Sequence, residues 1–95
     1  MAKQIPKGNG TATVVSAGTA VQLGANKCER VFVQAMDDNS GTLVVGDSSV
    51  VAAQATREGL ALFPAQGEWF NAENTNNLWI DSTVSGDKVN FYFDS

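Results

Sequence analysis

The sequence predicts an all-β fold: a small antiparallel β-sandwich of seven or eight short strands, of jelly-roll or immunoglobulin-like type. Segments in which apolar and polar residues alternate recur at a spacing of roughly ten residues. Clusters of Gly, Asn, Asp and Ser, which favour turns, separate these segments. No apolar stripe with the period of a helix persists along the chain. Evenly spaced strands without helices between them are typical of a sandwich or a small barrel.

The 95 residues are expected to form one domain preceded by a basic arm. Residues 1–10 hold a proline, two glycines and few apolar side chains, so we expect a flexible, extended N-terminal arm there. Residues 11–95 hold the sandwich domain. The arm carries Lys3 and Lys7 and no acid, whereas the rest of the chain carries four basic and ten acidic residues. This asymmetry predicts an arm that reaches an acidic neighbour, although a polar terminus that is merely soluble explains the same residues.

We expect the chain to be organised around residues 30–46. Two runs rich in β-branched and aromatic residues, 30–36 and 42–46, flank five residues that favour turns. This pattern is typical of a β-hairpin with a loop of about three to five residues. The sequence therefore predicts that the two runs pair with each other as neighbouring strands.

Further strands are expected to complete the sandwich. Pro64 ends one of them because proline cannot donate to a strand ladder. Trp69 and Phe70 stand side by side, so one of the two rings must face away from the core. For residues 48–59 we expect a loop or a single short turn with Val50 pointing inward, and one or two helical turns closed by a glycine are the alternative. The remaining expected strands are residues 11–15, 19–23, 60–63, 68–72, 78–81 and 88–93.

The residue types that most catalytic sites need are missing or isolated. The chain has no histidine, which removes the usual general base and the Ser–His and Cys–His dyads. Its single cysteine, Cys28, cannot form an internal disulfide or a usual zinc site, and we expect it to be a small buried residue rather than a reactive thiol. The acidic residues fall mostly in turns and at strand ends, where solvent surrounds them. We therefore expect no enzyme, no catalytic residues, no metal and no cofactor.

Residues 37–41 resemble the start of a calcium-binding loop, with oxygen ligands at alternate positions. The position at which such a loop needs a bidentate glutamate is Ser48, however. Turn formation accounts for the same five residues, so we expect a turn and not a calcium site.

Charge and hydropathy argue against two classes of partner. The net charge of −4 does not suit nucleic acid, which attracts clustered Lys and Arg. No apolar run is long enough for a signal peptide or a membrane span. We therefore expect no nucleic-acid partner, no membrane partner, and synthesis in a reducing cytoplasm.

Outward-facing aromatic residues predict a binding surface. Trp79, Tyr92 and whichever of Trp69 and Phe70 points outward are candidates for a platform that stacks on sugars, with the Asn-rich residues 71–77 supplying polar contacts. The same rings suit an interface between copies of the chain or with another protein, where aromatic residues are enriched. Of these two interpretations we favour the interface.

A set of strand-and-turn segments recurs in a known type of protein. The segments are residues 18–23 (GTAVQL), 28–35 (CERVFVQA), 38–46 (DNSGTLVVG), 60–62 (LAL) with 67–68 (GE), 77–81 (NLWID) and 86–91 (GDKVNF). Together they resemble small structural proteins of tailed-bacteriophage virions, namely head-decoration (cement) proteins and structural domains of tails and fibres. The resemblance covers about residues 18–93, and residues 48–59 are longer and richer in alanine than the pattern.

The resemblance implies a capsid decoration protein that binds the outer shell and stabilises it by bridging capsid subunits. Its partner would be the major capsid protein, and its copies would form a homo-oligomer, with a trimer favoured. It would act at the virion surface after synthesis in the host cytoplasm. The alternatives are a tail, collar or head-fibre component, or a carbohydrate-binding module. Candidate contact residues for the shell or for neighbouring copies are Lys3, Ile5, Lys7, Phe32, Trp69, Trp79 and Tyr92.

Overall fold

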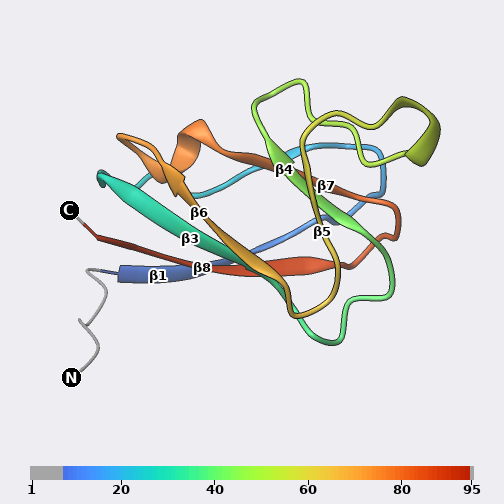
Figure 1. Cartoon of the computed structure of the whole chain (residues 1–95), viewed down its shortest axis with the longest axis horizontal. Helices are drawn as coiled ribbons and strands as arrows, with labels where there is room; N and C mark the ends of the chain where they lie inside the picture. Colours follow the sequence, from blue (N-terminus) through green and yellow to red (C-terminus); the bar gives the residue numbers. More distant parts are fainter. Residues whose placement is uncertain (1–7, 95) are drawn as a thin grey trace.

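A computed structural model describes residues 8–94 and shows two antiparallel sheets packed face to face (Figure 1). Sheet A contains β1, β8, β3 and β6 in that order, and sheet B contains β2, β7, β4 and β5. The expected all-β sandwich of short strands is confirmed. The elements are β1 (Gly8–Thr13), β2 (Val21–Gln22), β3 (Arg30–Ala35), β4 (Leu43–Gly46), η1 (Gln54–Thr56), β5 (Leu60–Leu62), β6 (Gly67–Asn71), η2 (Thr75–Asn77), β7 (Trp79–Ser82) and β8 (Lys88–Asp94), where η marks a short 3₁₀ turn.

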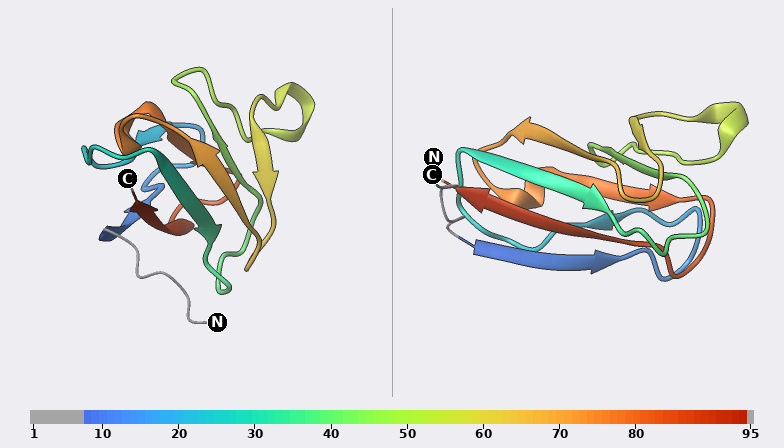
Figure 2. Two further views of the ribbon diagram at one scale, coloured as in Figure 1. Left: turned by 60° about the vertical axis from the view of Figure 1, so that its left-hand side comes forward. Right: turned by 60° about the horizontal axis from the view of Figure 1, so that its bottom comes forward.

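The order of the strands is that of a jelly roll. Every connection between consecutive strands of residues 8–94, except the one between β4 and β5, passes from one sheet to the other. Figure 2 shows these crossings at the two ends of the sandwich. Eight strands wound in this way form the two Greek keys of a jelly roll. An immunoglobulin-like sandwich instead keeps several consecutive strands as neighbours within one sheet, so the topology decides for the jelly roll.

The expected hairpin over residues 30–46 is wrong. β3 lies in sheet A between β8 and β6, whereas β4 lies in sheet B between β7 and β5. The residues between them are held by Asp87, just before β8, whose carboxyl oxygens accept the backbone N–H groups of Ser40 and Gly41 at 2.9 Å each. The Asn39 side chain also bonds the backbone at the start of β8. Asp87 is buried, contrary to the expectation for an acid in a turn, and it directs the chain across the sandwich.

The first strand begins earlier than expected. It was predicted over residues 11–15 and is observed over Gly8–Thr13, paired with β8 along its whole length. Residues 8–10, assigned to the arm from their composition, therefore belong to sheet A. The rest of the expected arm, residues 1–7, lies outside the described residues.

Glycines in β1 make room for the aromatic part of the core. Gly8 and Gly10 lie directly opposite Phe93 and Phe91 of β8. A Cβ added at Gly8 would stand 2.5 Å from Cζ of Phe93, and one at Gly10 would stand 2.7 Å from Cζ of Phe91. Residues without side chains therefore let both rings pack against β1. The buried residues between the sheets are Val14, Leu23, Cys28, Val31, Val33, Ala35, Leu43, Val45, Leu62, Leu78, Ile80, Val89, Phe91 and Phe93.

The predicted directions of several side chains are confirmed. β3 and β8 each bury alternate residues, as their patterns indicate. Of the two adjacent rings on β6, Phe70 packs against the core and Trp69 is exposed. On β7, Ile80 is buried between the sheets, while Trp79 faces the other way. Cys28 is buried, and its Sγ donates a hydrogen bond to the backbone of the residues after β6.

Residues 47–59 cover part of the outer face of sheet B. They form a loop with one short 3₁₀ turn, as expected, and Val50 points inward. Val50 and Ala52 pack with Val44, which is fully buried although it faces away from the main core. The carboxylate of Asp81 holds the loop by accepting the backbone N–H of Ala52 at 3.0 Å, and its other oxygen accepts an N–H from the β1–β2 connection. The outward side chains of sheet A, by contrast, are exposed or half-buried.

Candidate functional site

The outer face of sheet A gathers polar and aromatic side chains from its four strands. The register places Asn90 of β8 between Thr11 of β1 and Gln34 of β3. Two residues further along β8, Tyr92 lies opposite Phe32 of β3. Because side chains two residues apart share one face of a strand, these groups form a continuous surface.

We call Phe32, Trp69 and Tyr92 the aromatic cluster. The rings of Phe32 and Tyr92 are stacked, with centroids 5.2 Å apart and an interplanar angle of 26°. Trp69 meets both rings edge-on, at 5.2 Å from Phe32 and 5.4 Å from Tyr92. Phe32 also covers Gly67 of β6, where an added Cβ would lie 2.3 Å from the ring Cζ. Contacts between rings on adjacent strands stabilise a sheet, so the protein itself holds the cluster in place.

A charged group borders the aromatic cluster. The guanidinium of Arg30 lies over the Trp69 ring, with Cζ 4.3 Å from the ring centroid. Its Nε also contacts Oδ1 of Asp94 at 3.0 Å, and this hydrogen bond and the carboxylate charge raise the pKa of Arg30 above its ordinary value. The pair is exposed to solvent, so it contributes little to stability. Its main effect is to fix the Arg30 side chain over the indole.

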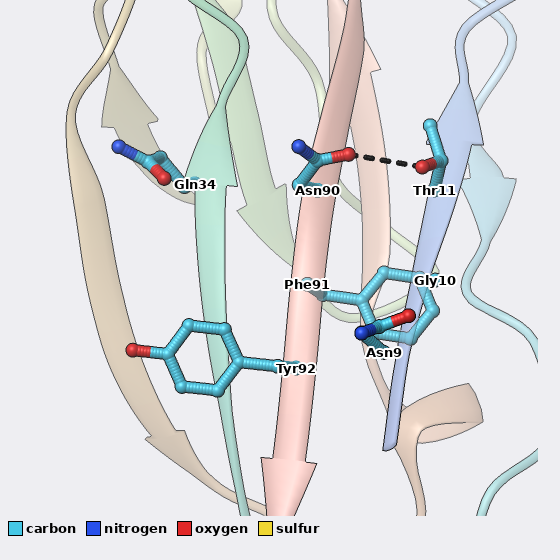
Figure 3. Close-up of a pocket in the computed structure, with 7 residues that line it drawn as sticks. All are labelled: Asn9, Gly10, Thr11, Gln34, Asn90, Phe91 and Tyr92. Carbon is cyan, nitrogen blue, oxygen red and sulfur yellow. Dashed lines mark hydrogen bonds between the residues drawn. The ribbon is translucent and has the colours of Figure 1, made fainter. Parts of the chain in front are cut away.

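A shallow groove of about 400 Å³ lies beside the aromatic cluster (Figure 3). We call it the amide groove, because three of its side chains are amides contributed by β1, β3 and β8. Its volume falls within the usual range for small-molecule sites. Among residues 8–94, none of those that line it carries a charge. The lining residues are Asn9, Gly10, Thr11, Gln34, Asn90, Phe91 and Tyr92.

Internal hydrogen bonds fix how two of these amides face the groove. Oδ1 of Asn90 accepts a bond from the Thr11 hydroxyl at 2.9 Å, which Figure 3 marks as a dashed line. Nε2 of Gln34 donates to the backbone carbonyl of Ala65 at 3.0 Å. These bonds engage the oxygen of Asn90 and the nitrogen of Gln34. Asn90 therefore presents its NH₂ group as a donor, and Gln34 presents its carbonyl oxygen as an acceptor.

Three of the four sheet edges carry features that oppose pairing with another strand. β2 is only two residues long. β5 has three residues and lies between Gly59, with a φ of +116°, and Pro64. On β6 the side chain of Glu68 accepts the backbone N–H of Trp69 at 3.2 Å, which occupies a main-chain donor of that edge strand. Short strands, proline and charged side chains all protect an edge in this way.

The edge of β1 differs from the other three. β1 is six residues long and contains neither a proline nor a charged residue. Among residues 8–94 it pairs with β8 on one side only, so within this part of the chain its other side is the free edge of sheet A. An uncharged edge of this length is a ready template for an added strand.

The candidate contact residues fall into three groups. Phe32, Trp69 and Tyr92 lie together in the aromatic cluster. Trp79 lies apart from them on the outer face of sheet B, where it packs beside Val44 under the loop. A sugar platform that combines Trp79 with Tyr92 is therefore wrong. The candidates outside the described residues are Lys3, Ile5 and Lys7.

Sequence reasoning missed the amide groove, although part of its signal was visible. The alternation of residues 30–36 and 88–93 already places Gln34, Asn90 and Tyr92 on outward faces. What brings them together is the pairing of β8 with both β1 and β3, which links distant parts of the chain.

Among residues 8–94, no group of three or more Cys, Asp or Glu side chains is placed to hold a metal ion. None of the helical turns in the described part of the chain is long and apolar enough to cross a membrane. No protein-family model matches the chain, and neither a curated protein nor a solved structure matches it.

Proposed function

We propose that this chain is a bacteriophage capsid decoration protein, which binds the outer shell and stabilises it by bridging subunits of the major capsid protein. The observation that carries the proposal is the free edge of β1, which lacks the protective features of the other three edges. Two further points support it. Residues 18–93 resemble phage virion proteins, and jelly rolls are frequent in viral capsid domains. The fold alone does not specify a function, so the edge is the feature to test.

Strand addition at β1 supplies a mechanism of attachment. An extended segment of a capsid subunit pairs with β1 through main-chain hydrogen bonds and lengthens sheet A by one strand. Each such bond contributes only about 0.5–1.5 kcal/mol net, so the affinity of one copy is modest. A partner that binds the assembled shell and not the free subunits shifts the equilibrium toward the shell. Many copies on a symmetric shell then add up to substantial stabilisation.

The residues that precede β1 extend the same attachment site in our proposal. Lys3 and Lys7 supply positive charge for an acidic patch on the shell, and Ile5 supplies an apolar contact. We further propose that copies associate as a trimer, with Trp69 at the β6 edge as the exposed aromatic residue for contact between them. Sedimentation equilibrium of the purified protein measures that stoichiometry directly.

Binding to shells assembled without this protein tests the proposal. We expect the wild-type protein to add to such shells in a saturable manner, measured by co-sedimentation. Thr13→Lys places a charge at the exposed end of β1, where it opposes an added strand, and we expect at least tenfold weaker binding. Thr56→Lys makes the same change at an exposed position on η1 and is expected to bind like wild type. Circular dichroism confirms that both variants are folded.

Two outcomes contradict the proposal at different levels. If Thr13→Lys binds as tightly as wild type, β1 is not the attachment edge. If the wild-type protein leaves the shells unoccupied at saturating concentration, decoration itself is wrong.

A further inference from the structure

We propose that the amide groove is a binding site for an uncharged oligosaccharide. The inference does not depend on attachment to a shell. The groove includes residues of β1, but it uses side chains on the outer face of sheet A, whereas strand addition uses main-chain groups at the edge of β1. Three properties of the groove carry it: a fixed donor and acceptor pair, an aromatic ring at one end, and a lining without charge.

The donor and acceptor pair matches sugar hydroxyl groups. Asn90 and Gln34 lie directly opposite each other on β8 and β3. The bond from Thr11 turns the Asn90 NH₂ toward a ligand, and the bond to Ala65 turns the Gln34 carbonyl oxygen toward it. A hydroxyl group accepts from the first and donates to the second, and neighbouring hydroxyls of one sugar satisfy both at once. Asn9, exposed on β1, adds a third amide within the same groove.

Tyr92 supplies the apolar contact. Its ring belongs both to the groove and to the aromatic cluster, where Phe32 stacks against it and Trp69 meets it edge-on. The C–H groups on one face of a sugar ring pack on such an aromatic surface. Because the protein already orders the tyrosine, binding loses little side-chain entropy there.

The charge distribution selects a neutral ligand. All seven lining residues are uncharged. Arg30 and Asp94, beside the aromatic cluster, are paired with each other at 3.0 Å. Lys88 shares the outward face of β8 with Asn90 but is not among the residues that line the groove. An anionic sugar would find no unpaired cation among the lining residues, whereas a neutral one finds amide and hydroxyl partners. An apolar protein segment is a poor match as well, because burial against it would leave the amides without hydrogen bonds.

The test uses the purified protein and defined neutral probes: cellohexaose, maltohexaose, laminarihexaose and chitohexaose. A hyaluronan hexasaccharide is the charged comparison. Binding is followed by ¹⁵N NMR through the side-chain NH₂ signals of Asn90 and Gln34. We expect at least one neutral probe at millimolar concentration to shift these signals in a saturable manner, while the charged probe leaves them in place.

Variants separate this site from contacts elsewhere. Asn90→Asp replaces the donor by an acceptor of the same shape, and we expect at least tenfold weaker binding. Asn77→Asp makes the same change at an exposed position of η2 and should bind like wild type. Gln34→Met removes the acceptor at an exposed position, and we expect it to weaken binding as well. This second variant tests the groove if Asn90→Asp does not fold. The proposal is overturned if no neutral probe shifts the signals, if only the charged probe does, or if the groove variants bind like wild type.

Discussion

Gly10 has no side chain, and this leaves the space beside β1 that the Phe91 ring occupies. In Gly10→Ala the new methyl group would lie 2.7 Å from Cζ and 3.1 Å from Cε1 of Phe91, which is itself buried, so the ring must move. Overpacking of this kind costs about 1–3 kcal/mol. We expect urea unfolding of the variant to show a loss of stability in that range.

Gly24 provides the matched control. A Cβ there would meet only Nδ2 of Asn26, at 3.8 Å, which is an ordinary contact. Gly24→Ala should therefore change the free energy of unfolding by no more than about 0.5 kcal/mol. Equal stabilities for the two alanine variants would show that the Phe91 ring does not depend on the space at Gly10.

At the scale of elements, Asp87 decides where the chain goes after β3. Its carboxyl group accepts the N–H groups of Ser40 and Gly41 and the hydroxyl of Ser82, at 2.8–2.9 Å. Asp87→Ala leaves the partly buried N–H groups of Ser40 and Gly41 without an acceptor, whereas the Ser82 hydroxyl retains the backbone carbonyl of Thr42 at 3.3 Å. Each unsatisfied group costs about 1–3 kcal/mol. We expect a loss of about 2–4 kcal/mol in urea unfolding, together with faster amide hydrogen exchange at Ser40 and Gly41.

Asp38 lies in the same connection but is exposed, so Asp38→Ala is the control and should stay within about 0.5 kcal/mol of wild type. If the two alanine variants are equally stable, the Asp87 carboxylate does not hold the crossing between the sheets.

The strands themselves were predictable, but their partners were not. Alternation along β8 and β3 is a local property of the sequence, and it places Val89, Phe91 and Val33 on one face of their strands, the face that is buried in the core. The turn residues between β3 and β4 are equally local, and they suit a hairpin as well as a crossing between sheets. What distinguishes the two is the bond from Ser40 to Asp87, 47 residues further along the chain. Local patterns carry no information on such a contact.

At the scale of the whole molecule, the candidate site depends on packing that joins both ends of the chain. Outward-facing aromatic residues were visible in the sequence, and Tyr92 and Trp69 do meet on one face. The amide groove was not visible, because Asn9 was assigned to an arm on account of its neighbouring glycines. Those glycines leave space for the rings of Phe91 and Phe93 on β8, which lie beside β1 only in the folded molecule.

Two deletions of different length are therefore expected to differ in their effect on stability. Removing residues 1–7 leaves the eight strands of residues 8–94, so we expect cooperative urea unfolding within about 1 kcal/mol of wild type. Removing residues 1–13 also removes β1 and uncovers Phe91 and Phe93, which are buried beside it. Exposing two such side chains costs about 3–6 kcal/mol, a large part of the 5–15 kcal/mol that stabilises a typical domain. We expect circular dichroism of the longer deletion to show a largely unfolded chain.

The shorter deletion also separates attachment from folding. Because residues 1–7 are part of the proposed attachment site and the described strands begin at Gly8, we expect their loss to weaken binding to shells while leaving saccharide binding in the amide groove unchanged. Loss of cooperative unfolding in the shorter deletion would mean that these residues support the sandwich. A decrease in shell binding could then no longer be ascribed to a contact with the capsid, and Thr13→Lys would remain the variant that tests attachment on an intact fold.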